Sequence, residues 1–334
     1  IFSMLSKTRW QVSPGLIMAQ FRTTLLILIA FAIPLSTSVV SILSLLLVLI
    51  WGLERNFKTK FREIVSNEVC VAVLIYLALY GIGMLWTDNL SVGGSVLKRY
   101  WKLLLMPIFL TAVPVEQRHK VIYGFLAGLL VMVVGTYLAW FDLWHYGGVS
   151  PEHPTRKLYH VVYNPMLALG CYLVIHELVW GGRSKRWQVA LSVIALLMII
   201  NMFITEGRSG QVAFFVLLFV FLLQLFRKKI ALGITLGVIV LPLLFVGGYK
   251  LSPNFQSRVD KAWHEIKIFD SHPQTSTGYR LYFWKISWEI FKENPLLGVG
   301  TGDYNDEYAL KNQERRKKDS LVVMDTTNPH NQYV

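Results

Sequence analysis

Residues 230–249 read IALGITLGVIVLPLLFVGGY, twenty consecutive positions without a charged side chain. About 20 apolar residues in a helix are needed to cross the hydrocarbon core of a bilayer. Similar windows recur along the chain: hydrophobic residues make up 54% of its 334 positions and charged residues only 16%. Soluble domains average about 25% charged residues. The sequence therefore predicts an all-α, polytopic helical membrane protein.

Outward from this segment, we predict nine membrane spans, at 17–34, 36–52, 68–86, 97–113, 119–140, 158–180, 187–205, 210–226 and 230–249. The first two form one run that is too long for a single span, and PLSTS at 34–38 is typical of a tight turn. The predicted domains are a transmembrane bundle over 1–249, a mostly helical segment outside the membrane over 250–330, and the start of a further transmembrane helix over 331–334.

The basic residues predict the orientation. Every second loop is rich in lysine and arginine, which is typical of cytoplasmic loops. Because these loops hold much of the net charge of +13, we expect membrane lipids and no nucleic acid as partners. With the N-terminus inside, residues after Lys250 emerge on the outer side. Cys70 and Cys171 lie in apolar windows and predict ordinary helix packing.

Positive charges on the predicted outer side oppose this rule. Snorkelling to lipid phosphates accounts for Lys98 and Lys157. Arg208 lies in TEGRSG at 205–210, a short link between two strongly apolar spans. An ionisable residue at such a membrane edge is a functional candidate. A structural salt bridge with Glu206 is the alternative interpretation.

Two amphipathic helices are predicted in the outer segment, over about 255–269 and 277–293. On the second, one face is apolar, with Leu281, Trp284, Trp288 and Phe291, and the other carries Lys285, Glu289 and Lys292. Arg280 precedes Trp284 by four residues, so both side chains project from the same side. The density of aromatic residues suggests that both helices lie near the membrane interface.

The second helix is followed by NPLLGVGTG at 294–302. A phosphate-binding glycine loop normally follows a strand and opens a helix. Because this loop closes a helix, a simple turn is the favoured interpretation. Asp303 and Asp306 are the nearest candidates for metal ligands, and their pattern is not that of a metal site. We therefore expect no metal and no other cofactor.

The last motif is NPHNQY at 328–333, which contains His330. Arg208, Arg280 and His330 all map to the predicted outer side. Histidine is the commonest general base at neutral pH, and arginine binds phosphate oxygens with two parallel hydrogen bonds. This set suits chemistry on a lipid-linked pyrophosphate sugar, although His330 alone would more often be structural.

These motifs, in this order, resemble the O-antigen ligase family, which shares a superfamily with O-antigen polymerases and bacterial protein O-oligosaccharyltransferases. The resemblance rests on Thr205-x-x-Arg208-x-Gly210, on Arg280-x-x-x-Trp284 with the following NPLLGVG, and on Pro329-His330-Asn331-x-Tyr333. The span layout is similar along essentially the whole chain, and the motifs cover about fifty residues. Further spans follow the histidine motif in the family, so we expect about twelve in a complete protein.

The resemblance implies a multi-pass glycosyltransferase of the bacterial inner membrane, with its active site and the 250–330 segment facing the periplasm. It would transfer a polysaccharide from undecaprenyl pyrophosphate to lipid A-core, with inversion and without a metal. His330 would be the base, and Arg208 and Arg280 would hold the pyrophosphate. Arg156, His160 and Trp284 are weaker candidates for substrate binding, since interfacial roles explain them equally well.

Two alternatives stay open. An O-antigen polymerase or a protein O-oligosaccharyltransferase would use similar chemistry on another acceptor. A polysaccharide-lipid transporter is the alternative from a different class. Transporters place polar residues at mid-membrane, whereas the suspicious charges here gather at one face, which favours an enzyme.

Overall fold

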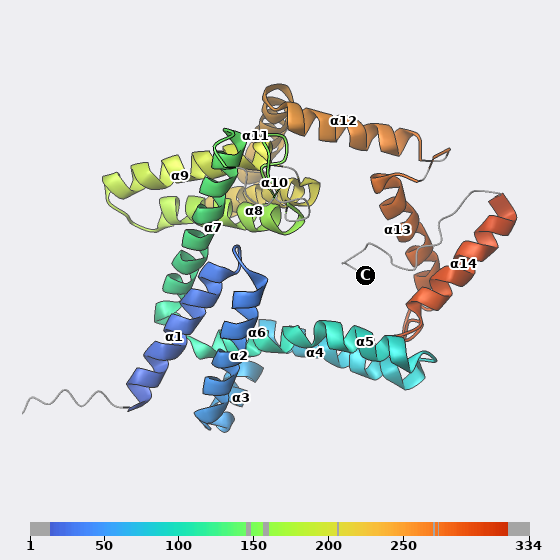
Figure 1. Ribbon diagram of the computed structural model, residues 1–334, viewed down its shortest axis with the longest axis horizontal. Helices are drawn as coiled ribbons and strands as arrows, with labels where there is room; N and C mark the ends of the chain where they lie inside the picture. Colours follow the sequence, from blue (N-terminus) through green and yellow to red (C-terminus); the bar gives the residue numbers. More distant parts are fainter. Residues whose placement is uncertain are drawn as a thin grey trace, which may run out of the picture. The chain divides into compact units, whose positions relative to one another are not determined.

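The structure is a computed structural model, and it describes residues 14–144, 148–155, 160–205, 207–269, 271, 272 and 274–319. Within these residues, the regular secondary structure is helical (Figure 1). The predicted all-α class is therefore confirmed. The chain divides into two compact units, residues 1–70 with 105–233 and residues 71–104 with 234–334. This division does not test the predicted boundary at residue 249.

Unit 1 contains the helices α1 (Pro14–Ala32), α2 (Thr37–Leu53), α3 (Phe57–Ser66), α6 (Leu105–Ala112), η3 (Val115–Gln117), α7 (Arg118–Trp140), α8 (His160–Trp180), α9 (Lys185–Ile204) and α10 (Arg208–Leu225). Helix α1 packs along α7 and α2, and α8 packs between α9 and α10. Unit 2 contains η1 (Gly83–Trp86), α5 (Leu90–Tyr100), η2 (Trp101–Leu104), α12 (Pro253–Lys267), α13 (Ser276–Glu293) and α14 (Tyr304–Asp319), with most of α4 (Glu68–Ile82) and α11 (Ile230–Leu251).

Five helices are long and apolar enough to cross a membrane, at Glu68–Trp86, Val115–Trp140, Val161–Trp180, Lys185–Ile204 and Ile230–Leu251. Helices α2 and α3 together would make a sixth, although they meet at a bend of 118°. Two predicted spans correspond to the shorter apolar helices Met18–Ala32 and Ser209–Leu225. These helices indicate a multi-pass membrane protein, while the count of nine spans stays a prediction.

The predicted span 97–113 is broken. It begins inside α5 and continues through the 3-10 turn η2 before α6 completes it. Proline lacks a backbone N–H and its ring clashes with the carbonyl four residues earlier, so an α-helix cannot continue undisturbed through Leu103 to Pro107. Hydropathy alone did not reveal this break.

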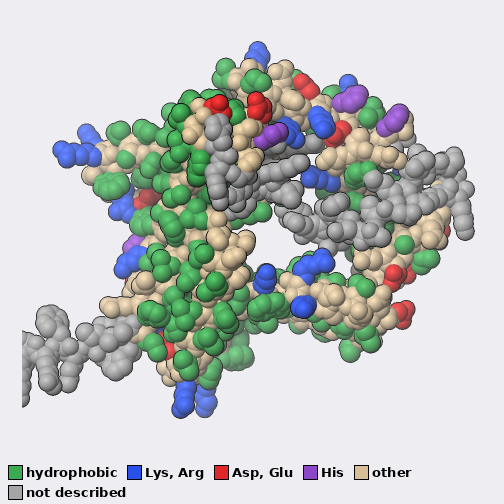
Figure 2. Space-filling view, viewed as in Figure 1, with side chains coloured by type: hydrophobic (Ala, Val, Ile, Leu, Met, Phe, Trp, Pro, Cys, Tyr) green, Lys and Arg blue, Asp and Glu red, His purple; other side chains and the backbone are tan. Residues whose placement is uncertain are grey.

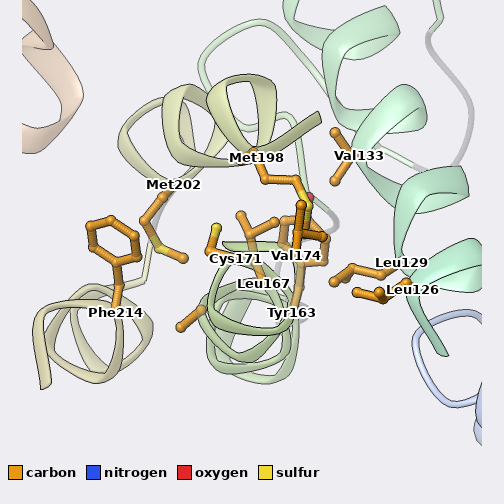
Figure 3. Close-up of a cluster of buried hydrophobic side chains, with 12 residues drawn as sticks. Leu126, Leu129, Val133, Tyr163, Leu167, Cys171, Val174, Met198, Met202 and Phe214 are labelled. Atoms are coloured by element: carbon orange, nitrogen blue, oxygen red, sulfur yellow. The ribbon is translucent and has the colours of Figure 1, made fainter. Parts of the chain in front are cut away.

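The central core of unit 1 lies where α7, α8, α9 and α10 meet. Figure 3 shows Met198 and Met202 of α9 directed toward Leu167 and Cys171 of α8, with Leu129 of α7 at the right of the cluster. The predicted packing role is confirmed for both cysteines, since Cys70 and Cys171 are free and buried. Hydrophobic side chains also cover outer surfaces of the helices, whereas basic side chains gather at the tip of α3 and at the outer end of α9 (Figure 2).

Helices α1 and α7 approach closely through two glycines. A Cβ at Gly124 would lie 2.7 Å from the carbonyl oxygen of Ile27, and one at Gly128 would lie 2.0 Å from that of Phe31. Glycines four residues apart allow the backbones of membrane helices to touch. The segment YGFLAG at 123–128 therefore specifies the α1–α7 contact.

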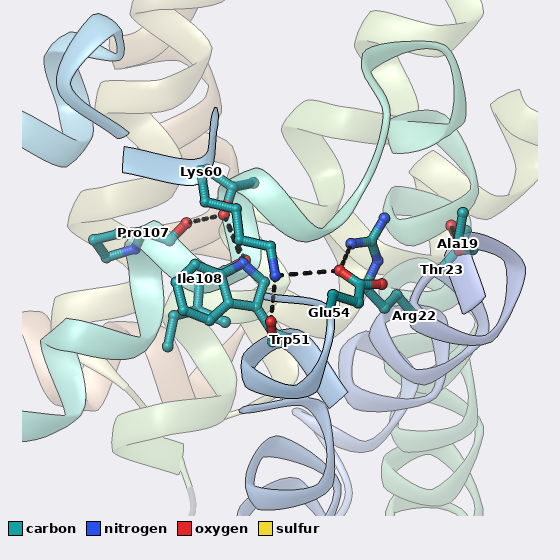
Figure 4. Close-up of polar contacts among 9 residues, drawn as sticks. Ala19, Arg22, Thr23, Trp51, Glu54, Lys60, Pro107 and Ile108 are labelled. Carbon is teal, nitrogen blue, oxygen red and sulfur yellow. Dashed lines mark hydrogen bonds and ion pairs between the residues drawn. The ribbon is translucent and has the colours of Figure 1, made fainter. Parts of the chain in front are cut away.

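A partly buried ion network joins α1, α3 and the end of α2. Figure 4 shows Lys60 Nζ directed to Glu54, 3.2 Å from its Oε2, and to the backbone carbonyl of Trp51. Arg22 donates to the same carboxylate, and Lys60 lies 4.4 Å from the centre of a Trp51 ring. Lys60 thus belongs to the basic loop that the sequence assigns to the cytoplasm, but its charge is turned inward and paired.

Candidate functional site

The TEGRSG link of unit 1 is shaped by two glycines that contact α8. A Cβ at Gly207 would lie 2.7 Å from Nδ2 of Asn164, and one at Gly210 would lie 2.2 Å from Cβ of Asn164. Only glycine allows the backbone to approach a neighbour this closely. The link therefore packs directly against Asn164. Helix α10 begins at Arg208, next to this contact.

A chain of buried polar groups lies beneath the link. Thr205 Oγ donates to Asn164 Oδ1 at 3.1 Å, and Tyr163 OH donates to Asn201 Oδ1 at 2.7 Å. Asn201 Nδ2 in turn donates to Thr136 Oγ at 2.7 Å. Side-chain hydrogen bonds across membrane helices fix their relative rotation and depth. The network therefore joins α7, α8 and α9 at the point where the link begins.

Asn164 is the most unusual member of this network. Its side chain is fully buried, and its Nδ2 group has no hydrogen-bond partner among the described residues. A buried donor without a partner lowers the stability of a fold by about 1–3 kcal/mol. Asn164 and Asn201 are not among the site residues predicted from the sequence. The signal was present, because both are strongly polar residues inside apolar windows.

The candidates of unit 1 gather at one end of its helices. Helix α8 begins at His160, and α10 begins at Arg208. Because Asn164 contacts Gly207 and Gly210, the first turns of the two helices lie side by side. The backbone positions of His160 and Arg208 therefore belong to the same end of the bundle. Their side chains, together with Arg156 and His330 as whole residues, lie outside the described part of the chain.

The candidates of unit 2 lie on α13, which confirms the helix predicted over 277–293. Trp284 is exposed, and Arg280 is exposed with it. The turn that carries Arg280 is held from two directions: Thr275 Oγ accepts from Gly278 N at 3.0 Å, and the buried Glu265 carboxylate accepts from Thr277 N at 3.0 Å. Glu265 belongs to α12, the helix predicted over 255–269. A carboxylate is favourable at this helix N-terminus because of the helix dipole.

The glycine loop after α13 is a turn that docks on the corner between η1 and α5. Thr301 N donates to Gly83 O at 3.2 Å, and Gly302 N donates to Thr87 Oγ at 3.2 Å. Thr301 Oγ donates to Tyr80 O at 2.7 Å. A phosphate-binding loop must leave its backbone N–H groups free for the ligand. These N–H groups are occupied within the protein, which supports the turn that the sequence favoured.

Asp303 completes this contact. Its buried carboxylate accepts from Asp88 N at 2.9 Å and from Asn89 N at 2.8 Å. Asn89 Nδ2 is 3.4 Å from the Asp306 carboxylate. Both acidic residues that the sequence considered as metal ligands therefore contact the start of α5. Among the described residues, no group of three His, Cys, Asp or Glu side chains could hold a metal ion.

The inner face of α13 packs against α14 in a cluster formed by Phe283, Ile286, Ile290 and Tyr308. Burial raises the pKa of the Tyr308 phenol and, less strongly, that of Tyr304. Both are therefore neutral packing groups at physiological pH. At the edge of the cluster, the Glu293 carboxylate accepts a hydrogen bond from Lys311. This contact raises the pKa of the Lys311 ammonium group.

Comparison with protein families matches residues 193–334 to the family described as O-antigen ligase. This part of the chain is similar to the O-antigen ligase family. The ligase-family region begins within α9 and contains Arg208, Arg280, Trp284 and His330, whereas Asn164 precedes it. No curated protein and no solved structure matches the chain. The family belongs to the O-antigen ligase and polymerase superfamily, whose members are glycosyl-transfer enzymes with polysaccharide and lipid substrates.

Proposed function

We propose that the protein ligates O-antigen polysaccharide from undecaprenyl pyrophosphate to lipid A-core at the periplasmic face of the bacterial inner membrane. The observation that carries the proposal is the family match over residues 193–334, because it includes all three residues to which the chemistry is assigned. The long apolar helices within this region and before it support a lipid-bound donor.

In the proposed reaction, His330 takes the proton from a hydroxyl of the acceptor sugar. The hydroxyl oxygen then attacks the anomeric carbon from the side opposite the pyrophosphate, so the configuration inverts. The bond between the anomeric carbon and the pyrophosphate oxygen breaks, and undecaprenyl pyrophosphate leaves with the electron pair. Negative charge grows on the leaving group during this step, and Arg208 and Arg280 would stabilise it there.

The proposed binding groups follow from position and charge. Arg280 is exposed on a helix turn that is fixed by Glu265 and Thr275, which suits a bidentate contact with a diphosphate. Arg208 lies in a link supported by Asn164. Trp284 would contact the sugar or lipid next to Arg280, and Arg156 and His160 would add to the anionic site. No step in this scheme requires a metal.

A genetic experiment separates the superfamily members. Lipopolysaccharide from cells that lack the protein should contain lipid A-core without polymer, while long polymer accumulates on the lipid carrier. A core that carries a single repeat unit would indicate a polymerase and would contradict the ligase. Loss of sugars from glycoproteins, with intact lipopolysaccharide, would indicate a protein O-oligosaccharyltransferase.

A biochemical experiment tests the reaction itself. The purified full chain, supplied with lipid-linked polymer and lipid A-core, should form the glycosidic product at the same rate with and without a metal chelator. If no product forms in membranes where the protein is folded, while lipid-linked polymer crosses the bilayer, the chain is a transporter. Loss of product in chelator would contradict the metal-independent mechanism.

A further inference from the structure

Helix α13 has two apolar faces, and only one of them is covered. The inner face, with Phe283, Ile286 and Ile290, is buried against α14. The other is the face that the sequence analysis selected, formed by Leu281, Trp284, Trp288 and Phe291, which we call the outer aromatic face. Trp284 is 65% exposed, Trp288 57% and Phe291 51%. The described residues therefore leave a contiguous row of large apolar side chains uncovered.

The exposed apolar surface continues past the end of the helix. Leu296 is 94% exposed and Leu297 is 72% exposed, and both follow α13 directly. The rings of Trp288 and Phe291 stack with centres 5.3 Å apart. Isolated exposed apolar residues are common on proteins, but a contiguous patch of this kind marks an interaction surface.

The position of the patch points to lipid. The loop that follows Leu297 is hydrogen-bonded to Tyr80, Gly83 and Thr87. These residues form the end of the candidate membrane span Glu68–Trp86. Because the patch ends only a few residues before this contact, Leu296 and Leu297 lie close in the chain to residues that contact the Trp86 end of this candidate span.

The charges at the borders of the face fit the same environment. Lys285 and Lys292 lie on one border, and Lys292 Nζ is 5.6 Å from the Trp288 ring centre. Arg280 lies on the other border, four residues before Trp284. Glu289 is directed away from the face, because its carboxylate binds Arg315 of α14. Exposed tryptophans flanked by cations are typical of helices in the interface of anionic lipid.

We propose that the outer aromatic face of α13, together with Leu296 and Leu297, inserts into the lipid interface at the Trp86 end of α4. Lys285 and Lys292 contact anionic lipid phosphates, and the aromatic rings lie at the depth of the glycerol region. One consequence rests on the proposed function: Arg280, at the border of this face, is held at the level of the lipid phosphates, where the pyrophosphate of a lipid-linked donor lies.

Spin labelling of the full chain tests the insertion. Nitroxides are attached to Trp288→Cys, Leu297→Cys and Gln313→Cys, in a chain whose two native cysteines, both buried, are replaced by alanine. The protein is reconstituted in vesicles of phosphatidylethanolamine and phosphatidylglycerol without donor or acceptor. Gln313 is the control because it is exposed on α14, away from the face.

We expect the labels at 288 and 297 to be relaxed by oxygen and shielded from a water-soluble nickel chelate, and the label at 313 to show the reverse. Equal nickel accessibility at all three positions would overturn the proposal. Dipolar broadening between labels at 288 of neighbouring molecules would also overturn it and would indicate a second copy of the chain. Shielding of the labels from both reagents would indicate a protein partner and would likewise exclude insertion into lipid.

Charge is tested separately. With Lys285→Gln and Lys292→Gln combined, the label at 288 should become shallower in phosphatidylglycerol vesicles and stay unchanged in neutral phosphatidylcholine. An equal depth in both lipids would contradict the assigned phosphate contacts. Because no reaction is measured, these results stand even if the ligase assignment fails. For the consequence on Arg280, Leu297→Ser should raise KM for a long-chain lipid donor several-fold and leave KM for a short-chain soluble donor unchanged.

Discussion

The buried carboxylate of Asp303 accepts a hydrogen bond from the backbone N–H of Asn89 at 2.8 Å, across 214 residues of sequence. Its second oxygen accepts from Asp88 N at 2.9 Å. Hydrogen bonds to a charged acceptor are stronger than neutral ones, at about 1.5–3 kcal/mol. The pair joins the loop after α13 to the start of α5, and it therefore fixes the helix that carries Arg280 within unit 2.

Asp303→Asn should lower the free energy of unfolding of unit 2 by about 1–3 kcal/mol, because an amide N–H₂ group then faces a backbone donor inside the protein. Thermal unfolding in detergent, followed by circular dichroism, measures the effect. Asp306→Asn is the control, since the contact of its carboxylate with Asn89 is long at 3.4 Å, and it should change stability by less than about 0.5 kcal/mol. Equal behaviour of the two variants would show that the buried carboxylate is not needed.

Gly128→Ala should separate α1 from α7, because its Cβ would lie 2.0 Å from the carbonyl oxygen of Phe31. Overpacking of this kind costs about 1–3 kcal/mol. Gly247→Ala in α11 is the matched control, since no atom lies within 4 Å of the new Cβ. The melting temperature in detergent should fall for Gly128→Ala and stay close to that of the parent for Gly247→Ala. A Gly128→Ala protein as stable as the parent would argue against the close α1–α7 contact.

Asn164→Ala should reduce transfer about 10-fold or more, because the TEGRSG link loses the amide group that lies against Gly207 and accepts the hydrogen bond of Thr205. A shift of about 1 Å in a group that positions substrate can cost 100-fold in rate. The readout is kcat and KM for the lipid-linked donor, together with the melting temperature. Gln188→Ala, an exposed change on α9, should leave all three unchanged. Unaltered kinetics for Asn164→Ala would restrict this residue to packing.

His330→Ala should lower kcat about 100- to 10,000-fold, which is the usual contribution of a general base. Donor affinity should be nearly unchanged, because the base contacts the acceptor. His264→Ala removes an exposed histidine of α12 and should have no effect. The assignment of His330 is wrong if its alanine variant keeps full activity, or if it loses donor binding and turnover together.

Arg280→Lys should be nearly as impaired as Arg280→Ala, because lysine keeps the charge but lacks the planar fork that binds two phosphate oxygens. Both variants should weaken donor binding and slow transfer. Arg186→Lys, at an exposed position of α9, is the control, and it should leave donor binding and transfer unchanged. Full rescue by lysine would indicate that Arg280 acts as a simple point charge.

Sequence reasoning predicted the membrane class and the helices α12 and α13, because long apolar windows and helical periodicity are local properties. It did not predict the break at Trp101–Leu104, since the composition of 97–113 is that of a span. For α13 it selected the outer aromatic face as the apolar one, whereas the structure buries Phe283 and Ile286 against α14. Which of two apolar faces is covered depends on a partner helix that the local pattern does not contain.

The candidate site was predictable only in part. Arg208 and Arg280 stood out because charge at a membrane edge is rare. Asn164 and Asn201 are less conspicuous, and their importance depends on three helices meeting at one depth. The role of Asp303 was equally hidden, because its partners Asp88 and Asn89 are more than 200 residues away. Contacts at such separations cannot be read from spacing.

Unit 2 is formed by two stretches of chain, 71–104 and 234–334, which in the sequence precede and follow residues 105–233 of unit 1. Synthesis proceeds at about 5–20 residues per second, so Asp303 follows Asn89 by roughly 10 to 40 s. During this interval the start of α5 is already made while its carboxylate partner does not yet exist. The corner at Thr87–Asn89 therefore lacks its carboxylate partner during this interval, and the unit that carries Arg280 can be completed only after Asp303 has been synthesised.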